Sequence, residues 1–242
     1  MDNVSRRDAL RAMAVTAGAV TAASVMPHGV LDAADALAAT STPPTSLTPD
    51  QAIARLAAGN RRFVNGDLRH PRRDGRRRAA VAEGQAPYAV VLGCADSRVP
   101  PEVIYDEGLG NLFVVRIAGN TATDPYVLGS VEYGGVELGA VVIVVLGHEG
   151  CGAVKAAIDV AQNGTQLPGD IGAFVAPIVP VAQRLIPTTP KDELLQAVTL
   201  ANISQSVAAL QQNSLLAESI AAGKLAVVGG EYQARSGKVL IP

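Results

Sequence analysis

Residues 88–98 read "YAVVLGCADSR", an apolar run that ends in a thiol, a carboxylate and a guanidinium. Three other runs, "NLFVVRIAG" (111–119), "AVVIVVLG" (140–147) and "KLAVVGG" (224–230), are also rich in β-branched residues and do not alternate apolar with polar positions. Such continuous runs are typical of strands that are buried on both faces of a parallel sheet. The sequence therefore predicts four core strands.

Segments with helical character separate these strands. Residues 124–139 lie between the second and third strands, residues 151–162 follow the third, and residues 191–222 precede the fourth. Alternation of strand and helix is the signature of an α/β fold, so we predict a mainly parallel sheet of about four core strands with flanking helices.

An amphipathic helix is predicted before the first strand, in "TPDQAIARLAAGNRRFVNG" (48–66). Thr48 can cap its amino end, Pro49 suits the first turn, and Gln51 completes a capping box. This helix begins the single domain that we expect over residues 48–242. The domain's core must be built from Val, Ala, Leu and Ile, because aromatic residues make up 3% of the chain and Trp is absent.

The first 47 residues have a different character. Arg6 and Arg7 precede an apolar, Ala-rich stretch, and "ADALAAT" (34–40) offers small residues at a cleavage site after Ala38. This order resembles a twin-arginine export signal over residues 1–38, followed by a Thr/Ser/Pro linker over 39–47. We therefore expect a periplasmic or extracellular protein. No later apolar run approaches about 20 residues, so no membrane span is expected in the mature chain.

The charge pattern gives little reason to expect nucleic acid as a partner. The formal net charge is -2, which produces no general attraction for a polyanion. The stretch 69–85, "RHPRRDGRRRAAVAEGQ", is locally basic but lacks the interleaved aromatic residues of a base-stacking surface. We interpret it as a helix that faces solvent or another subunit.

The chain has two cysteines, Cys94 and Cys151, and the second follows His148 at His-x-x-Cys spacing. In an exported protein, two cysteines first suggest a disulfide, and a redox pair or two inert packing residues are further alternatives. Cys94 and His148 each follow a predicted strand, however. Ligands bind at the carboxyl ends of parallel strands, so the three residues would converge if the first and third strands are neighbours.

Two thiolates and an imidazole form a suitable zinc set, and three protein ligands leave a fourth position open, as in catalytic sites. The remaining histidines, His28 and His70, lie in the signal and in the basic stretch. Asp96 and Arg98 follow Cys94 closely. A bidentate pair would hold the Asp96 carboxylate ionised and oriented. Asp96 could then accept a hydrogen bond from an attacking water, or itself take the fourth position on the metal in a closed state.

Four consecutive blocks, "GQAPYAVVLGCADSRVPPE", "LFVVRIAGN", "GSVEYG" and "VLGHEGCGAV", resemble those of the β-class carbonic anhydrases. The resemblance implies zinc-dependent, reversible hydration of carbon dioxide to bicarbonate and a proton, with one Zn²⁺ per chain, and a homodimer or tetramer. By position, it makes Cys94, His148 and Cys151 the zinc ligands and Asp96 and Arg98 a catalytic dyad. Gln85 matches a glutamine that hydrogen-bonds substrate and that the partner subunit can supply.

The sequence departs from the family pattern at three points. Glu149 follows the ligand histidine where Ser is common, Ile117 stands where many relatives have Asn, and the absence of Trp weakens the case for a Trp-containing inhibitory bicarbonate site. Three alternatives stay open. They are a zinc hydrolase of another small C=O or C=S substrate, a non-catalytic exported zinc-binding protein, and a thiol–disulfide protein.

Tyr133 is a candidate for the wall of the substrate pocket.

Overall fold

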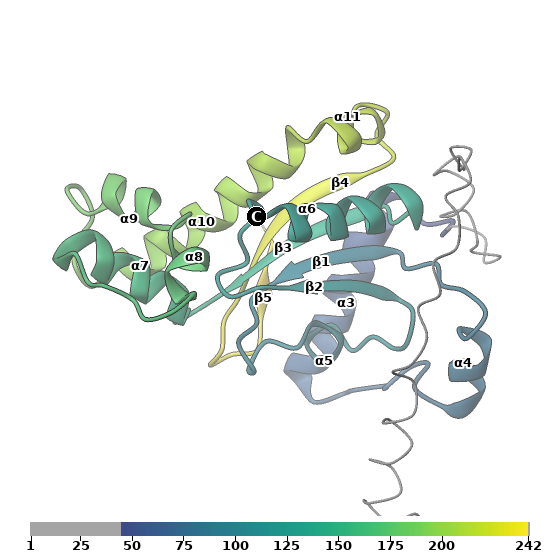
Figure 1. Cartoon of the computed structure of the whole chain (residues 1–242). Helices are drawn as coiled ribbons and strands as arrows, with labels where there is room; N and C mark the ends of the chain where they lie inside the picture. Colours follow the sequence, from purple (N-terminus) through teal and green to yellow (C-terminus); the bar gives the residue numbers. More distant parts are fainter. Residues whose placement is uncertain (1–44, 242) are drawn as a thin grey trace, which may run out of the picture. The chain divides into compact units, whose positions relative to one another are not determined.

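The structure, a computed structural model, describes residues 45–241, so the expected export signal and most of the linker lie outside the described residues. The described part has a five-stranded sheet in the order β2-β1-β3-β4-β5 (Figure 1). The strands are β1 (Ala89–Gly93), β2 (Leu112–Arg116), β3 (Val142–His148), β4 (Ala226–Tyr232) and β5 (Val239–Leu240). The first four are mutually parallel, and β5 runs antiparallel to β4.

The α/β prediction is confirmed, and each of the four predicted strands is present. Every residue of β1 and of β3 is buried, as the continuous apolar runs indicate for a sheet covered on both faces. The fifth strand was not predicted, because two residues are too short to produce a recognisable pattern. The condition for a converging site is also met, since β1 pairs directly with β3.

One face of the sheet is covered by α6 (Pro125–Glu132), α10 (Leu194–Gln211) and α11 (Ser214–Ala221). The π-helical turn η1 (Tyr133–Glu137) extends α6. The predicted helical region 191–222 is two helices, because the side chain of Asn213 caps the start of α11.

The opposite face is covered by α3 (Pro49–Asn65) and α5 (Pro101–Ile104). The predicted capping box of α3 is present. The backbone N–H of Gln51 donates to Thr48 Oγ1 at 3.3 Å, and the backbone N–H of Thr48 donates to Gln51 Oε1 at 2.9 Å. The basic stretch contains the short helix α4 (Gly75–Ala80).

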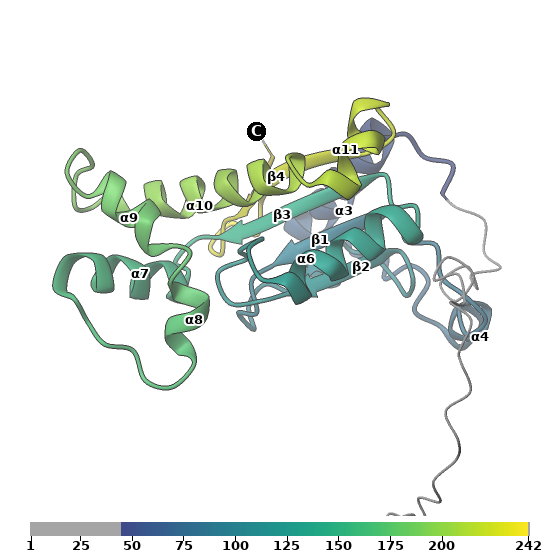
Figure 2. The same cartoon turned by 45° about the horizontal axis from the view of Figure 1, so that its top comes forward.

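A third layer stands beyond the carboxyl end of β3, formed by α7 (Gly152–Asn163), α8 (Ile171–Val175) and α9 (Val179–Leu185) (Figure 2). These helices pack with the start of α10 around a separate apolar cluster, which includes both cysteines. The arrangement closes the carboxyl edge of the sheet with protein, so that residues at the ends of β1 and β3 are buried.

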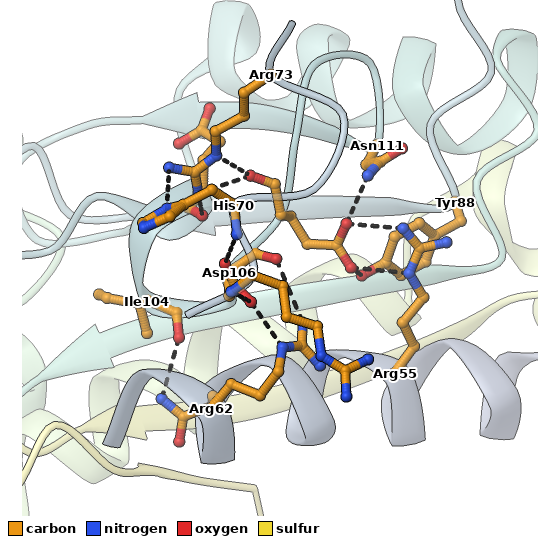
Figure 3. Close-up of polar contacts among 12 residues, drawn as sticks. Arg55, Arg62, His70, Arg73, Tyr88, Ile104, Asp106 and Asn111 are labelled. Carbon is orange, nitrogen blue, oxygen red and sulfur yellow. Dashed lines mark hydrogen bonds and ion pairs between the residues drawn. The ribbon is translucent and has the colours of Figure 1, made fainter. Parts of the chain in front are cut away.

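An ion-pair cluster fastens α3 and the basic stretch to the loop that follows α5 (Figure 3). Arg55 holds both oxygens of the buried Glu107 at 2.8 and 2.7 Å, and Tyr88 and Asn111 donate to the same carboxylate. The prediction that the basic stretch faces solvent or a subunit is therefore incomplete. Arg73 donates to the carbonyl of Glu107, which docks the stretch within its own chain.

Beside this cluster, Asp106 is fully buried and accepts from Arg62 Nε at 2.6 Å and from the backbone amides of Arg69 and His70, each at 3.0 Å (Figure 3). Burial disfavours its charge, but these hydrogen bonds outweigh burial and lower the pKa of Asp106.

No helix among residues 45–241 has both the length and the apolar character needed to cross a bilayer.

Candidate metal centre and active site

The structure brings together the three residues that the sequence predicts as zinc ligands. Cys94 follows β1 directly, His148 is the last residue of β3, and Cys151 immediately precedes the first residue of α7. Their side chains are 4%, 1% and 1% exposed, and their candidate ligand atoms all lie within 4.8 Å of one another. Neighbouring parallel strands and one following turn thus deliver two sulfurs and an imidazole to a single point.

The separation of the sulfurs fits a zinc ion. Both cysteines are free, with Sγ atoms 4.0 Å apart, so the structure contains no disulfide between them. Two sulfurs that each lie about 2.3 Å from a tetrahedral zinc are about 3.8 Å apart. The spacing in the protein therefore suits shared coordination of a zinc-sized ion without a change of backbone.

The imidazole of His148 is oriented for the same purpose. Its Nδ1 lies 3.1 Å from the carbonyl oxygen of Glu149, which can only accept a hydrogen bond, so Nδ1 carries the proton. Its Nε2 is buried and has no hydrogen-bond partner among the described residues. The lone pair of Nε2 is therefore available to a metal ion. The contact of Nδ1 with the Glu149 carbonyl fixes the tautomer in which Nε2 carries that lone pair.

The two thiols differ in acidity. The sulfur of Cys151, the ring of His148 and the amide of Gly119 together outweigh burial and lower the pKa of the Cys94 thiol well below its usual range. The proximity of Cys94, together with burial, raises the pKa of the Cys151 thiol, because two adjacent thiolates repel one another. A cation is therefore needed to hold both sulfurs as thiolates.

Asp96 and Arg98 form the predicted bidentate pair. Arg98 Nε lies 2.9 Å from Oδ1 and Nη2 lies 2.8 Å from Oδ2, and the Arg98 amide also donates to Oδ1. These hydrogen bonds hold the pKa of Asp96 far below its usual range. Oδ2 of Asp96 lies 3.9 Å from Nε2 of His148, so an ionised carboxylate lies beside the three candidate metal ligands.

Sequence reasoning missed one residue of this site. Arg116, the last residue of β2, donates through Nε to the carbonyl of Cys94 at 2.9 Å and through Nη2 to the carbonyl of Asp96. It thereby holds the backbone of the segment that carries both a ligand and the carboxylate. Only the pairing of β1 with β2 places it there, and no local pattern in the sequence indicates that contact.

Gln85 and Tyr133 are not part of the cluster in their own chain. Gln85 precedes β1, whereas Cys94 follows it, so the whole length of β1 separates them. Tyr133 packs against Phe113, near the start of β2, with 5.9 Å between ring centroids. That Tyr133 lines the wall of the substrate pocket stays a prediction.

Glu149 is partly buried, and its amide donates to the carbonyl of Tyr232 at 2.9 Å. Its side chain lines a cavity of about 300 Å³ together with Gln196 and Arg235, while none of the three predicted ligands lines that cavity. Glu149 therefore lies beside this cavity, which the predicted ligands do not line.

Comparison with known proteins agrees with this geometry. The sequence model of the family described as "Carbonic anhydrase" matches residues 89–239. The chain is 44% identical over 198 residues to carbonic anhydrase 2 of Mycobacterium tuberculosis, a match that covers 80% of this chain and 92% of the relative. It is 40% identical over 194 residues to a carbonic anhydrase of Mycolicibacterium smegmatis, covering 79% and 92% respectively.

Two solved structures that share this architecture are described as β-carbonic anhydrases. The β-carbonic anhydrase CafA of Aspergillus fumigatus superposes with a TM-score of 0.64 at 25% identity, over 78% of this chain and 89% of that one. One of two β-carbonic anhydrases of Sordaria macrospora, described as tetrameric, gives a TM-score of 0.62 at 25% identity, over 76% and 93%.

Proposed function

The chain belongs to the carbonic anhydrase family, in its β class, and we propose that it hydrates carbon dioxide reversibly to bicarbonate and a proton with one zinc ion per chain. The observation that carries the proposal is the convergence of Cys94, His148 and Cys151 beside a carboxylate that Arg98 holds ionised. Bound there, zinc would supply a Lewis acid that makes water a nucleophile near neutral pH.

The residues around the cluster have separable roles. Asp96, ionised and fixed in direction by Arg98, can accept a hydrogen bond from the attacking water and orient it toward carbon dioxide. Arg116 donates to the backbone carbonyls of Cys94 and Asp96, which fixes the positions of these two residues relative to each other. The helices α7, α8 and α9 pack with both cysteines in one apolar cluster and so exclude bulk water from the sulfurs.

We further propose that the substrate pocket is completed by a second copy of the chain. Gln85 cannot serve the cluster of its own subunit, because β1 separates them. It can serve a partner's cluster if two subunits pack with the amino end of one β1 near the carboxyl end of the other. The relative from Sordaria macrospora that shares this fold is described as tetrameric, which supports an oligomer here.

Export by the twin-arginine route remains part of the proposal. Arg6 and Arg7 are the residues that would direct it. The full-length chain should appear outside the cytoplasm, and replacement of both arginines by lysine should retain it inside. Equal extracytoplasmic carbonic anhydrase activity from the two forms would contradict the proposal.

A related chemistry, attack on a small C=S substrate, uses the same ligands, so the substrate must be tested directly. The zinc-loaded protein should turn over carbon dioxide far faster than carbonyl sulfide or carbon disulfide when the three are compared at equal concentration. Turnover of a sulfur compound with no hydration of carbon dioxide would replace the proposed function by the alternative.

A further inference from the structure

Helix α10 buries three polar side chains in a face that otherwise packs on apolar residues. Thr199, Asn202 and Ser206 are 3%, 1% and 3% exposed. Burial of a polar group is costly unless it is hydrogen-bonded. Thr199 satisfies its hydroxyl within the helix, on the carbonyl of Leu195 at 2.8 Å. Asn202 and Ser206 do not, and their partners lie in another part of the chain.

Both partners belong to the loop that follows β2, residues 117–122. Asn202 Nδ2 donates to the carbonyl of Gly119 at 2.8 Å. Ser206 Oγ donates to the carbonyl of Asn120 at 3.2 Å and accepts from the Ala122 amide at 3.3 Å. Residues four positions apart lie on one face of a helix, so α10 holds this loop at successive carbonyls.

The other side of the loop meets the metal cluster. The amide of Gly119 donates to Sγ of Cys94 at 3.4 Å. Gly119 has a φ of +83°, which favours glycine, and a Cβ atom there would lie 2.7 Å from Ile178 Cδ1 and 3.2 Å from Ala153 Cβ. The backbone can approach the sulfur this closely because the residue has no side chain.

Gly119 thus connects the helix to the ligand. Its carbonyl accepts from Asn202, and its backbone N–H points at the Cys94 sulfur. We propose that Asn202 is a positioning residue for the metal centre, which aims the Gly119 amide at the Cys94 thiolate. The proposal rests on the proposed function, in that Cys94 binds the metal.

The N–H···S contact matters because it fixes the direction of the Cys94 sulfur and also changes the charge that the thiolate donates to its metal. Groups that orient metal ligands in this way commonly change metal affinity or activity by 10- to 100-fold when replaced. The side-chain amide of Asn202 therefore does more than attach α10 to the loop that follows β2.

The test replaces Asn202 by Asp, which has the same shape but cannot donate to the Gly119 carbonyl when ionised. Two variants on the same helix serve as matched controls. Gln205→Glu removes an amide that donates to the Pro177 carbonyl at 3.3 Å, away from the loop, and Thr199→Val removes a buried hydroxyl. Zinc affinity by competition with a chelator and the sulfur-to-metal absorption of the cobalt-substituted protein are measured, together with unfolding of the metal-free chains.

Asn202→Asp should weaken zinc binding by about 10- to 100-fold and shift the cobalt absorption band, while both controls keep the parent values. In the contrary case, Asn202→Asp changes the unfolding of the metal-free chain, while zinc affinity and the cobalt absorption band stay as in the parent. That result would overturn the proposal and leave Asn202 as a packing contact. If Asn202→Asp does not fold, Asn202→Ala decides, because it also removes the donor to the Gly119 carbonyl but introduces no charge. A shifted band in that variant supports the proposal, and a parental band with parental affinity overturns it.

These readouts do not depend on hydration of carbon dioxide. A parent protein with a cobalt–thiolate band but no hydration activity would contradict the proposed function and leave the role of Asn202 testable. A parent protein without that band would contradict the ligand assignment, and the role of Asn202 with it.

Discussion

The guanidinium of Arg98 holds both carboxylate oxygens of Asp96, and one of those oxygens lies 3.9 Å from Nε2 of His148. The pair is more than a surface ion pair, because it fixes an acceptor beside a nitrogen that has no other partner among the described residues. A charge that is held at a constant place and in a constant protonation state can orient a reacting water in the same way in every turnover.

Replacement of Asp96 by Asn should therefore reduce kcat/KM for hydration about 10²- to 10³-fold while the zinc content stays at one per chain. The loss arises from the missing acceptor rather than from the metal. Asp159→Asn is the matched control, since Asp159 is a surface carboxylate on α7 that accepts from Asn163 at 2.7 Å. Unchanged activity in Asp96→Asn would exclude the role assigned to the dyad and favour a non-catalytic zinc protein.

Replacement of Cys151 by Ser should remove bound zinc, measured by metal analysis after dialysis, because a hydroxyl does not replace a thiolate as a ligand. Hydration activity should fall to the level of the metal-depleted parent. His70→Ala, at a histidine outside the cluster, should keep both the metal and the activity. A full complement of zinc in Cys151→Ser would show that the ligand set is wrong.

Gln85 offers a test of the shared pocket. A Gln85→Leu chain keeps its metal ligands, and a Cys151→Ser chain keeps Gln85, so each homo-oligomer should have low activity. Mixed oligomers should recover activity, since the zinc-bearing cluster of the first chain can receive Gln85 from the second. Activity of co-refolded mixtures is compared with that of the separate proteins combined without exchange. No gain on mixing would indicate that Gln85 does not act across subunits.

Acid should destabilise the fold in part through Asp106. Its pKa is lower in the folded than in the unfolded chain, so the ionised carboxylate stabilises the fold above the unfolded value, about 3.9, and this contribution is lost as the pH falls through the folded value. Asp106→Asn should cost about 2 kcal/mol near pH 6. The difference in unfolding free energy between parent and variant, from urea titrations at fixed protein concentration, should shrink toward zero in acid. A difference that grows in acid would contradict this assignment.

The sequence predicts the parts of the protein that depend on local pattern. Buried runs such as the one ending at Leu92 indicated the strands, the Thr48–Gln51 box indicated the first helix, and Cys94 and His148 stood at strand ends where parallel topology gathers ligands. Whether those ends were adjacent depended on strand order, which the run of residues does not specify. The family resemblance, rather than the pattern alone, separated zinc from a disulfide.

What could not be predicted depends on contacts between distant segments. Arg116 reaches Cys94 only because β2 pairs with β1, and Asn202 reaches Gly119 across 83 positions of sequence. From the sequence alone, the basic stretch resembles a solvated surface. In the fold, Arg73 donates to the carbonyl of Glu107, and the backbone amide of Arg69 donates to the carboxylate of Asp106. The same limit applies to Tyr133, whose ring packs against Phe113 near the start of β2.

The most direct test of the account is stopped-flow hydration of carbon dioxide by zinc-loaded protein (residues 39–242), with the metal-depleted protein as control, between about pH 6 and pH 9. The account predicts rapid, zinc-dependent turnover that rises toward alkaline pH, because two thiolates donate more charge to the metal than imidazoles do and leave the attacking water less acidic. Absence of turnover from folded, zinc-loaded protein across this range would contradict the account.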